Sequence, residues 1–124
     1  MGQSKLELVR PVMPEPWSAA EATRRLNEMA KNPDCFNVSF KLHALEQMEA
    51  REITAPDVLY VLRTGFVYEA PVPATQPLLY RYAIKGPTPN SNRREVRVVA
   101  VPSLHHADIK IITVMWADEP RTKG

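Results

Sequence analysis

The spacing of the apolar residues changes most clearly at Gly65, about halfway along this 124-residue chain. Before Gly65, most apolar residues recur every three or four positions, as they do in helices that bury one face. After it, they alternate with polar residues, as in strands whose side chains point to opposite faces of a sheet. Helices followed by strands favour an α+β domain, with the helices packed on one face of a small antiparallel sheet.

The first helix is expected to begin at Ser18. Ser18 and Glu21 have the spacing of a capping box, in which each side chain satisfies a backbone amide of the first turn. Trp17, just before the cap, is expected to pack on Ala22. Pro33 lies beyond the last apolar position and is expected to end the helix region.

Two further helices are expected between residues 41 and 65. The first covers residues 41–51. The second has clear boundaries, because Thr54 and Asp57 form another cap pair and Pro56 lies in the first turn, where a missing N–H does no harm. Gly65 is expected to close this helix in the left-handed conformation.

Strands are expected at residues 36–40, 66–69, 78–85, 95–101 and 109–116. In the segment 78–85, alternation places Tyr80 and Tyr82 on one face, and Arg81 and Lys85 on the other. Residues 86–93 are rich in turn formers and predict a hairpin. Taken together, residues 1–16 are expected to form an arm, residues 17–117 a single domain, and residues 118–124 a tail.

The composition excludes several classes of protein. No apolar run is long enough to span a membrane, and no apolar signal core follows the polar first residues, so we expect a cytoplasmic protein. The single cysteine, Cys35, fits a reducing compartment. We find no phosphate loop, dinucleotide fingerprint or nucleophile elbow, and His105, His106 and Asp108 lack a fourth ligand at fixed spacing. We therefore expect neither a cofactor nor a metal.

The charge is unevenly distributed. Residues 1–77 hold eight Lys or Arg and ten Asp or Glu, whereas residues 78–124 hold eight and four. The positive half is the part expected to form the sheet. A basic sheet face attracts phosphate, although a solvated surface with a chance asymmetry explains the same pattern.

Several motifs resemble an uncharacterised bacterial domain family with the pattern H-A-x-x-R-M-x-x-R-G-I. They are HALEQM at 43–48, REIT at 51–54, VLRTG at 61–65 and the apolar run IITVMW at 111–116. The resemblance covers residues 36–117. Gln47 replaces the usual Arg of the pattern, and Glu52 replaces the usual Gly.

That family is similar to the RelE/BrnT-like toxins of bacterial toxin–antitoxin pairs. The resemblance implies a RelE-like fold, possible cleavage of mRNA without a metal, and an antitoxin protein as partner. The Arg-to-Gln replacement at position 47 removes a cation beside the motif histidine, which puts tight phosphate binding in question.

Metal-free RNA cleavage needs groups that transfer protons and cations that stabilise the phosphate. His43 is the candidate acid–base, and Arg51 is the second candidate catalytic residue. Gln47 lies between them at four-residue spacing, so the three side chains share one helical stripe and Gln47 is a candidate RNA ligand. The alternative is structural: His43 caps or packs the helix, and Arg51 pairs with a nearby carboxylate of Glu46, Glu49 or Asp57.

The strands supply further RNA-binding candidates. Arg81, Lys85 and Arg97 are possible phosphate ligands, with a solvated sheet face as the alternative. Tyr82 could stack on bases if its face is open, although the apolar pattern also suits the core. Thr113 interrupts an apolar strand, either to hydrogen-bond a ligand or as a satisfied core hydroxyl.

Two other functions remain open at this point. The chain can be a non-catalytic binding or regulatory module with the same fold, which the modest net charge of +2 favours. It can also be a homo-oligomeric structural protein, in which the strand at 109–116 pairs at a sheet edge.

Overall fold

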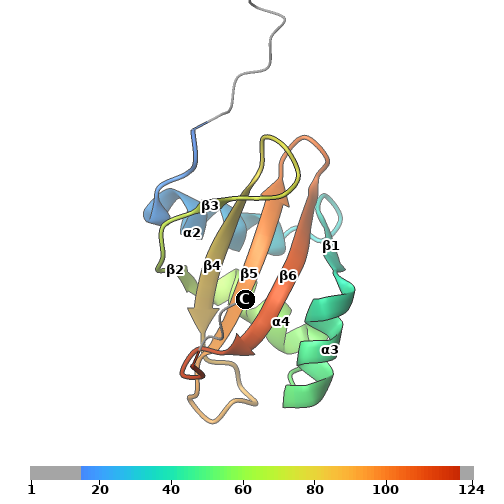
Figure 1. Ribbon diagram of the computed structural model, residues 1–124, viewed down its shortest axis with the longest axis vertical. Coiled ribbons are helices and arrows are strands. Elements are labelled where there is room, and N and C mark those ends of the chain that lie inside the picture. The colour runs from blue at the N-terminus through green and yellow to red at the C-terminus, as the bar shows by residue number, and fades with distance from the viewer. Residues whose placement is uncertain (1–14, 121–124) are drawn as a thin grey trace, which may run out of the picture.

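The computed structural model describes residues 15–120. It contains three helices and six strands among these residues (Figure 1). In chain order they are α2 (Ala19–Ala30), β1 (Asn37–Phe40), α3 (Leu42–Arg51), α4 (Ala55–Thr64), β2 (Phe66–Val67), β3 (Val72–Pro73), β4 (Tyr80–Gly86), β5 (Val96–Ser103) and β6 (Asp108–Trp116). The expected order of helices and strands is confirmed, and most of the expected arm (residues 1–14) lies outside the described residues.

The strands form one mixed sheet in the order β1-β6-β5-β4-β2, with β3 paired to β4 beside this path. β4, β5 and β6 form an antiparallel meander, as expected. The expectation of a wholly antiparallel sheet is wrong for β1, which pairs in parallel with β6 from Asn37–Asp108 to Phe40–Ile111. The helices α3 and α4 lie between β1 and the later strands in the sequence, and this long connection is what parallel neighbours require.

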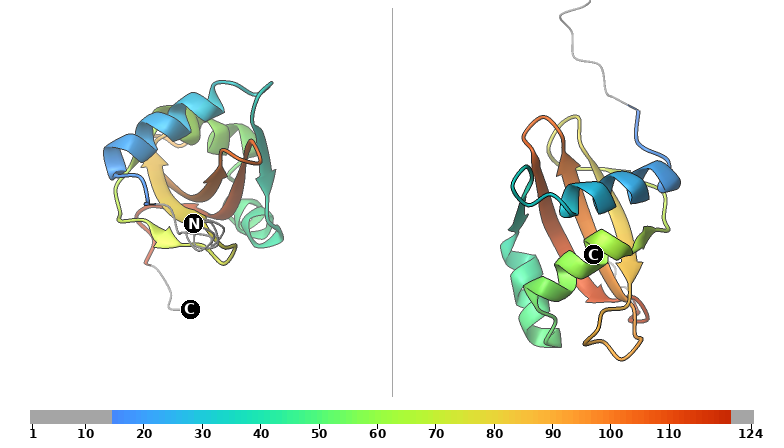
Figure 2. Two further views of the ribbon diagram at one scale, coloured as in Figure 1. Left: turned by 90° about the horizontal axis from the view of Figure 1, so that it is seen from above. Right: turned by 180° about the vertical axis from the view of Figure 1, so that it is seen from behind.

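The main core lies between one face of the sheet and the helices α2 and α4, which cross that face (Figure 2). The largest fully buried side chains come from both layers: Leu26, Leu62, Ile84, Ile109, Ile111, Val58, Val61, Val96, Val98 and Val114. α3 lies at the side of the sheet, next to β6. The opposite face of the sheet carries no helix among the described residues, and we call it the open face.

Of the two predicted capping boxes, one forms in full and the other in part, because the Glu21 carboxylate accepts hydrogen bonds from Arg24 and Arg25. The Ser18 hydroxyl accepts a hydrogen bond from the Glu21 amide, and α4 begins with a complete capping box between Thr54 and Asp57. Trp17 packs against the core cluster that contains Ala22, and it also makes a longer-range contact. The Trp17 ring stacks on Tyr82 with centroids 5.4 Å apart, and its backbone N–H donates to the Tyr82 hydroxyl. The first helix is therefore fastened to the sheet at its N-terminus.

Gly65 ends α4 as predicted, but the expectation of a left-handed conformation is wrong. Its φ of −82° and ψ of −172° are extended values that any residue adopts. The reason for glycine is a close approach: an added Cβ would lie 2.6 Å from the carbonyl oxygen of Lys85 and 2.7 Å from that of Val61. Glycine here lets the end of α4 pass directly over β4.

A β-bulge interrupts the pairing of β5 with β6. Val99 lies opposite Thr113 and the next residue, Ala100, lies opposite Ile111, so Ile112 is the extra residue. A bulge lets two consecutive side chains turn towards the same side of a sheet. Ile112 and Thr113 both line cavities of the open face.

Candidate functional site

The chain between β2 and β4 lies across part of the open face (Figure 2). We call residues 69–76 of this chain the strap. Two polar contacts fasten it to the sheet: Arg97 donates to the Glu69 carboxylate at 3.1 Å, and Lys110 donates to the Gln76 side-chain oxygen at 2.7 Å. The short strand β3 adds backbone pairing to β4 between these contacts. These contacts hold the strap against the sheet, so that the strap forms one side of the cavities on the open face.

One cavity of about 430 Å³ lies between the strap, the start of α3 and the sheet. Its lining contains Lys41, which is the N-cap of α3, His43 from the first turn of α3, Arg81 from β4 and Lys110 from β6. No acidic residue is among the described residues that line it. We call it the cationic pocket.

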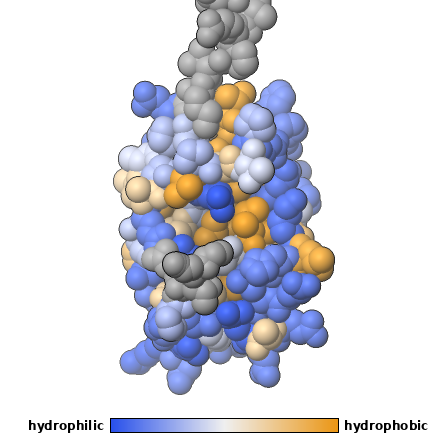
Figure 3. All heavy atoms as spheres, viewed as in Figure 1, coloured by the Kyte–Doolittle hydropathy of each residue, from blue (hydrophilic) through white to orange (hydrophobic). Residues whose placement is uncertain are grey.

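The remaining lining of the cationic pocket is largely apolar. Ala74, Val101 and Ile112 contribute to it. Figure 3 shows the same side of the molecule as Figure 1, with an apolar patch in the middle surrounded by hydrophilic residues. The site therefore combines an apolar surface with cations around it, which suits a ligand that has both a flat apolar part and an anionic group.

Arg81 has an unsatisfied donor. Its Nε atom is buried and makes no hydrogen bond within the described part of the chain. A buried N–H of a cationic group without an acceptor is costly, and such groups in native proteins call for a missing partner. An oxygen of a bound anion is the acceptor that a guanidinium prefers.

A second cavity of about 250 Å³ adjoins the first, with Arg81 in the lining of both. Its lining includes the polar side chains of Glu69, Arg97 and Thr113. We call it the polar pocket. The two pockets lie along the open face beside the strap, because Glu69, Ala70 and Val72 line the polar pocket and residues 74–76 line the cationic one.

A family model described as a domain of unknown function, DUF4258, matches residues 40–116, which is more than half of the chain. The chain belongs to the DUF4258 family. The matched segment includes all four basic residues of the cationic pocket and both ends of the strap. No curated protein and no solved structure matches the chain. The match agrees with the expected uncharacterised domain family, and the likeness to RelE/BrnT toxins stays a prediction.

Outside the DUF4258 segment, residues 15–39 still contribute to the fold. Leu26 and Met29 of α2 are buried in the main core, and β1 completes the sheet beside β6. The family match therefore covers the pockets but only part of the structural unit.

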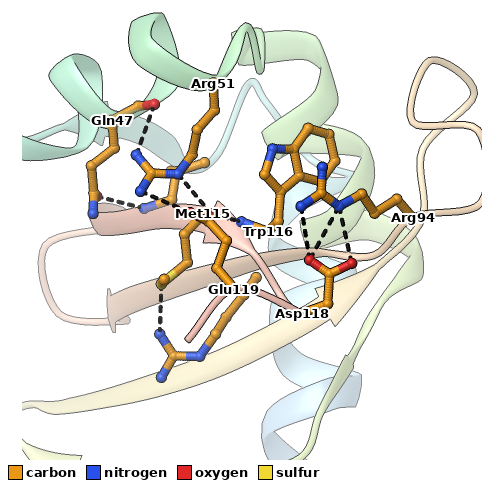
Figure 4. Close-up of polar contacts among 9 residues, drawn as sticks. Gln47, Arg51, Arg94, Met115, Trp116, Asp118 and Glu119 are labelled. Atoms are coloured by element: carbon orange, nitrogen blue, oxygen red, sulfur yellow. Dashed lines mark hydrogen bonds and ion pairs between the residues drawn. The ribbon is translucent and has the colours of Figure 1, made fainter. Parts of the chain in front are cut away.

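Gln47 and Arg51 act together at the edge of β6 in the DUF4258 segment. β1 pairs only with the first part of β6, and the Gln47 side-chain oxygen accepts the Val114 amide further along, at 2.9 Å. Arg51 donates to both carboxylate oxygens of Glu119, at 2.7 and 3.1 Å. Glu119 in turn accepts the Trp116 amide at 2.8 Å. Figure 4 shows these contacts.

Neither Gln47 nor Arg51 lines the cationic pocket. Arg51 pairs with Glu119, which is not among the nearby carboxylates expected from the sequence. The ion pair and the Trp116 amide hold the pKa of Glu119 below its ordinary value, although partial burial opposes the shift. The contacts of Gln47 and Arg51 are structural, and their predicted roles towards RNA stay predictions without support from the geometry.

Two further predicted RNA ligands, Arg97 and Lys85, form ion pairs with carboxylates of the chain. Arg97 is 9% exposed and donates to the Tyr68 hydroxyl at 2.7 Å as well as to Glu69. Lys85 pairs with Glu95 at 3.3 Å and lies 4.5 Å from the Tyr68 ring centroid. Arg97 still lines the polar pocket, whereas Lys85 lines neither of the two pockets.

Tyr82 faces the helices, not the open face. It is 3% exposed, and its stacking on Trp17 is part of the core. Burial raises the pKa of Tyr82, and the hydrogen bond from the Trp17 amide opposes that rise. The geometry removes Tyr82 from the surface on which a base could stack.

Lys41, Lys110 and Gln76 were missed from the sequence. Lys110 had a usable signal, because it interrupts an otherwise apolar strand as Thr113 does. Lys41 lies two residues before His43, at the start of the same helix. Gln76 lies in a proline-rich loop with no regular pattern, and nothing local indicated its contact with Lys110.

The described residues hold neither a membrane-spanning helix nor a cluster of metal ligands. None of the helices within residues 15–120 is long and apolar enough to cross a membrane. Within the same residues, no three His, Cys, Asp or Glu side chains lie together as the ligands of a metal ion would.

Proposed function

We propose that the protein binds RNA by its phosphate backbone in the cationic pocket and cleaves it there without a metal. The observation that carries the proposal is the convergence of His43, Arg81, Lys41 and Lys110 on one cavity. These residues come from three separate elements, and the buried Nε of Arg81 needs an acceptor. The side chain of Arg81 is partly exposed and lines the pocket, and phosphodiester oxygens are the acceptors that a guanidinium prefers.

His43 is the proton-transfer group of the proposed reaction. It lies at the exposed start of α3 and is the only histidine in the lining of the pocket within the described residues. Its neutral imidazole would take the proton of a ribose 2′-hydroxyl while the O2′–P bond forms and the P–O5′ bond breaks. The leaving 5′-oxygen receives a proton from a neighbouring ammonium group, Lys41 or Lys110. The products are a 2′,3′-cyclic phosphate and a 5′-hydroxyl.

The cations of the pocket stabilise the extra charge that develops on the phosphate in this reaction. Arg81 suits this role because its planar guanidinium donates two parallel hydrogen bonds to phosphate oxygens. The absence of an acid among the described lining residues also removes a source of repulsion. This proposal extends the resemblance to RelE/BrnT toxins, with an antitoxin protein as the controlling partner.

A non-catalytic RNA-binding module is the second candidate. The single histidine in the described lining favours it, since only lysine ammonium groups are present to take the place of a second acid–base, and an ammonium is a weaker general acid than an imidazolium. The cationic pocket is the binding site in both cases. The two candidates differ only in what happens to the bound phosphodiester.

The test combines binding and cleavage of a labelled single-stranded RNA in the presence of a metal chelator. We expect His43→Ala to reduce cleavage by at least about a hundredfold and to change the dissociation constant only a few-fold. Arg81→Gln is expected to weaken binding by about tenfold and to lower the salt dependence by about one phosphate contact. His105→Ala, in an exposed loop away from this pocket, is the matched control and is expected to act as wild type.

Binding that depends on Arg81 without any cleavage, alone or with ribosomes, would favour the binding module. RNA affinity that is unchanged in both Arg81→Gln and Lys110→Gln would contradict both candidates. Expression of wild type and His43→Ala in bacteria, with growth and total RNA followed together, separates a toxin from a harmless RNA-binding protein.

A further inference from the structure

Arg81 lies between two cavities of different character. The cationic pocket presents the apolar side chains of Val101 and Ile112 beside its cations. The polar pocket presents Thr113 together with the Arg97–Glu69 pair. Arg81 lines both, so a phosphate bound by its guanidinium would have a cavity on each side.

The bulge in β6 places one residue in each cavity. Ile112 lines the cationic pocket and Thr113, its neighbour in the chain, lines the polar pocket. In a regular strand these two side chains would point to opposite faces of the sheet. The register shift between β5 and β6 makes both available on the open face, next to each other. The two cavities therefore share Arg81 and take consecutive residues of β6 into their linings.

We propose that the unit recognised is a dinucleotide step, with its phosphodiester on Arg81 and one nucleoside in each pocket. This inference rests on the proposed function and specifies its ligand. The base in the cationic pocket packs against Val101 and Ile112, which suits the apolar face of any base. The nucleoside in the polar pocket meets the hydroxyl of Thr113, which can donate or accept a hydrogen bond.

The chemical difference between the pockets gives each a separate role. Apolar packing contributes affinity that depends little on the identity of the base. A fixed hydroxyl and a fixed ion pair discriminate between bases or sugars, since a wrong partner leaves a buried polar group unsatisfied. We therefore place sequence preference, or the choice of RNA over DNA, in the polar pocket.

The experiment compares dinucleoside monophosphates with their component mononucleotides. The sixteen dinucleotides carry a 2′-O-methyl group on the first ribose so that they cannot be cleaved. Binding is measured at one salt concentration by calorimetry, and the His43 and Arg81 side-chain signals are followed by NMR. We expect at least one dinucleotide to bind about tenfold more tightly than the stronger of its two mononucleotides.

Variants assign the two nucleosides to their pockets. Thr113→Val keeps the shape of the side chain and removes the hydroxyl, so we expect it to abolish the tenfold advantage and to leave mononucleotide binding unchanged. Ile112→Ala is expected to weaken mononucleotides and dinucleotides alike. Thr64→Val, on the exposed end of α4, is the matched control for loss of a threonine hydroxyl.

The outcomes separate this inference from the proposed function. Mononucleotides that shift the His43 and Arg81 signals, with no dinucleotide binding more than twofold better, would overturn the dinucleotide step and leave the cationic pocket as a phosphate site. Failure of every nucleotide and of inorganic phosphate to shift these signals would overturn both proposals. An advantage that persists in Thr113→Val would also overturn the assignment of the polar pocket.

Discussion

Gly65 is the point at which the last helix meets the sheet. The carbonyl oxygens of Lys85 and Val61 leave no room for a Cβ at this position. Asn27 of α2 donates to the carbonyl of Leu62 at 2.7 Å in the same region, so three elements converge here. A single missing methyl group sets how closely α4 can approach β4.

We predict that Gly65→Ala destabilises the protein by about 1–3 kcal/mol, because the added methyl group must displace backbone atoms of two elements. Gly86→Ala is the matched control. Its Cβ would meet Gly65 Cα at 3.2 Å, a milder contact, so we expect a smaller loss. Urea unfolding monitored by circular dichroism measures both. Equal stability of Gly65→Ala and wild type would show that the close approach can relax without cost.

At the scale of elements, α3 substitutes for a missing part of β1. The four residues of β1 cover only the first part of the edge of β6, and Gln47 and Glu119 accept amides from the rest of that edge. Since an arginine side chain has no acceptor, it could not take over the hydrogen bond from Val114.

We predict that Gln47→Ala lowers the free energy of unfolding by about 1–2 kcal/mol, since it leaves the Val114 amide without its acceptor. Gln47→Glu keeps an acceptor and is expected to lose less, while Gln47→Arg is expected to resemble Gln47→Ala. Thermal unfolding ranks the three variants, and amide hydrogen exchange at Val114 reports the bond itself. Similar exchange rates in Gln47→Ala and wild type would exclude this role for the side chain.

The local part of the fold could be predicted from the sequence, and the long-range part could not. The caps at Ser18 and Thr54 lie within three residues of their partners, so spacing alone indicated them. The alternation in β4 also fixed which residues face the core. The parallel pairing of β1 and the stacking of Trp17 on Tyr82 join residues more than 60 positions apart, and no local pattern specifies them.

The candidate site, too, could be predicted from the sequence only in part. Arg81 and His43 were identified by residue type, and the fold brings both to one cavity. Arg51 shares a helical stripe with His43, but its partner Glu119 is 68 residues away, so the stripe did not reveal its contact. Helical spacing places side chains on one face of an element and does not say what lies opposite them.

At the scale of the whole molecule, two carboxylates link stability to pH. Burial raises the pKa of Asp57, but hydrogen bonds from Thr54 and Asn90 outweigh it and hold the pKa below its ordinary value. The hydrogen bonds from Arg51 likewise hold the pKa of Glu119 below its ordinary value. A carboxylate with a lowered pKa in the folded state stabilises the protein above its ordinary pKa, and this stabilisation is lost as the pH falls through the folded-state pKa.

We predict that the free energy of unfolding decreases below about pH 4, where these carboxylates begin to be protonated. Glu119→Gln is expected to cost about 1 kcal/mol at pH 7 and to make the acid limb less steep. Glu46→Gln, which removes an exposed carboxylate on the same helix as Arg51, is the control. Urea unfolding at several pH values tests this, and parallel curves for Glu119→Gln and wild type would rule out the linkage.

The outermost strands of the sheet are short, and this limits how another polypeptide can join it. β1 has four residues, while β2 and β3 have two each. Extending a sheet by an added strand needs a longer row of accessible backbone groups, and short edge strands are a common protection against it. An inhibitory partner protein, or a second copy of this chain, would therefore have to contact side chains on a helix or cover the entrances of the two pockets.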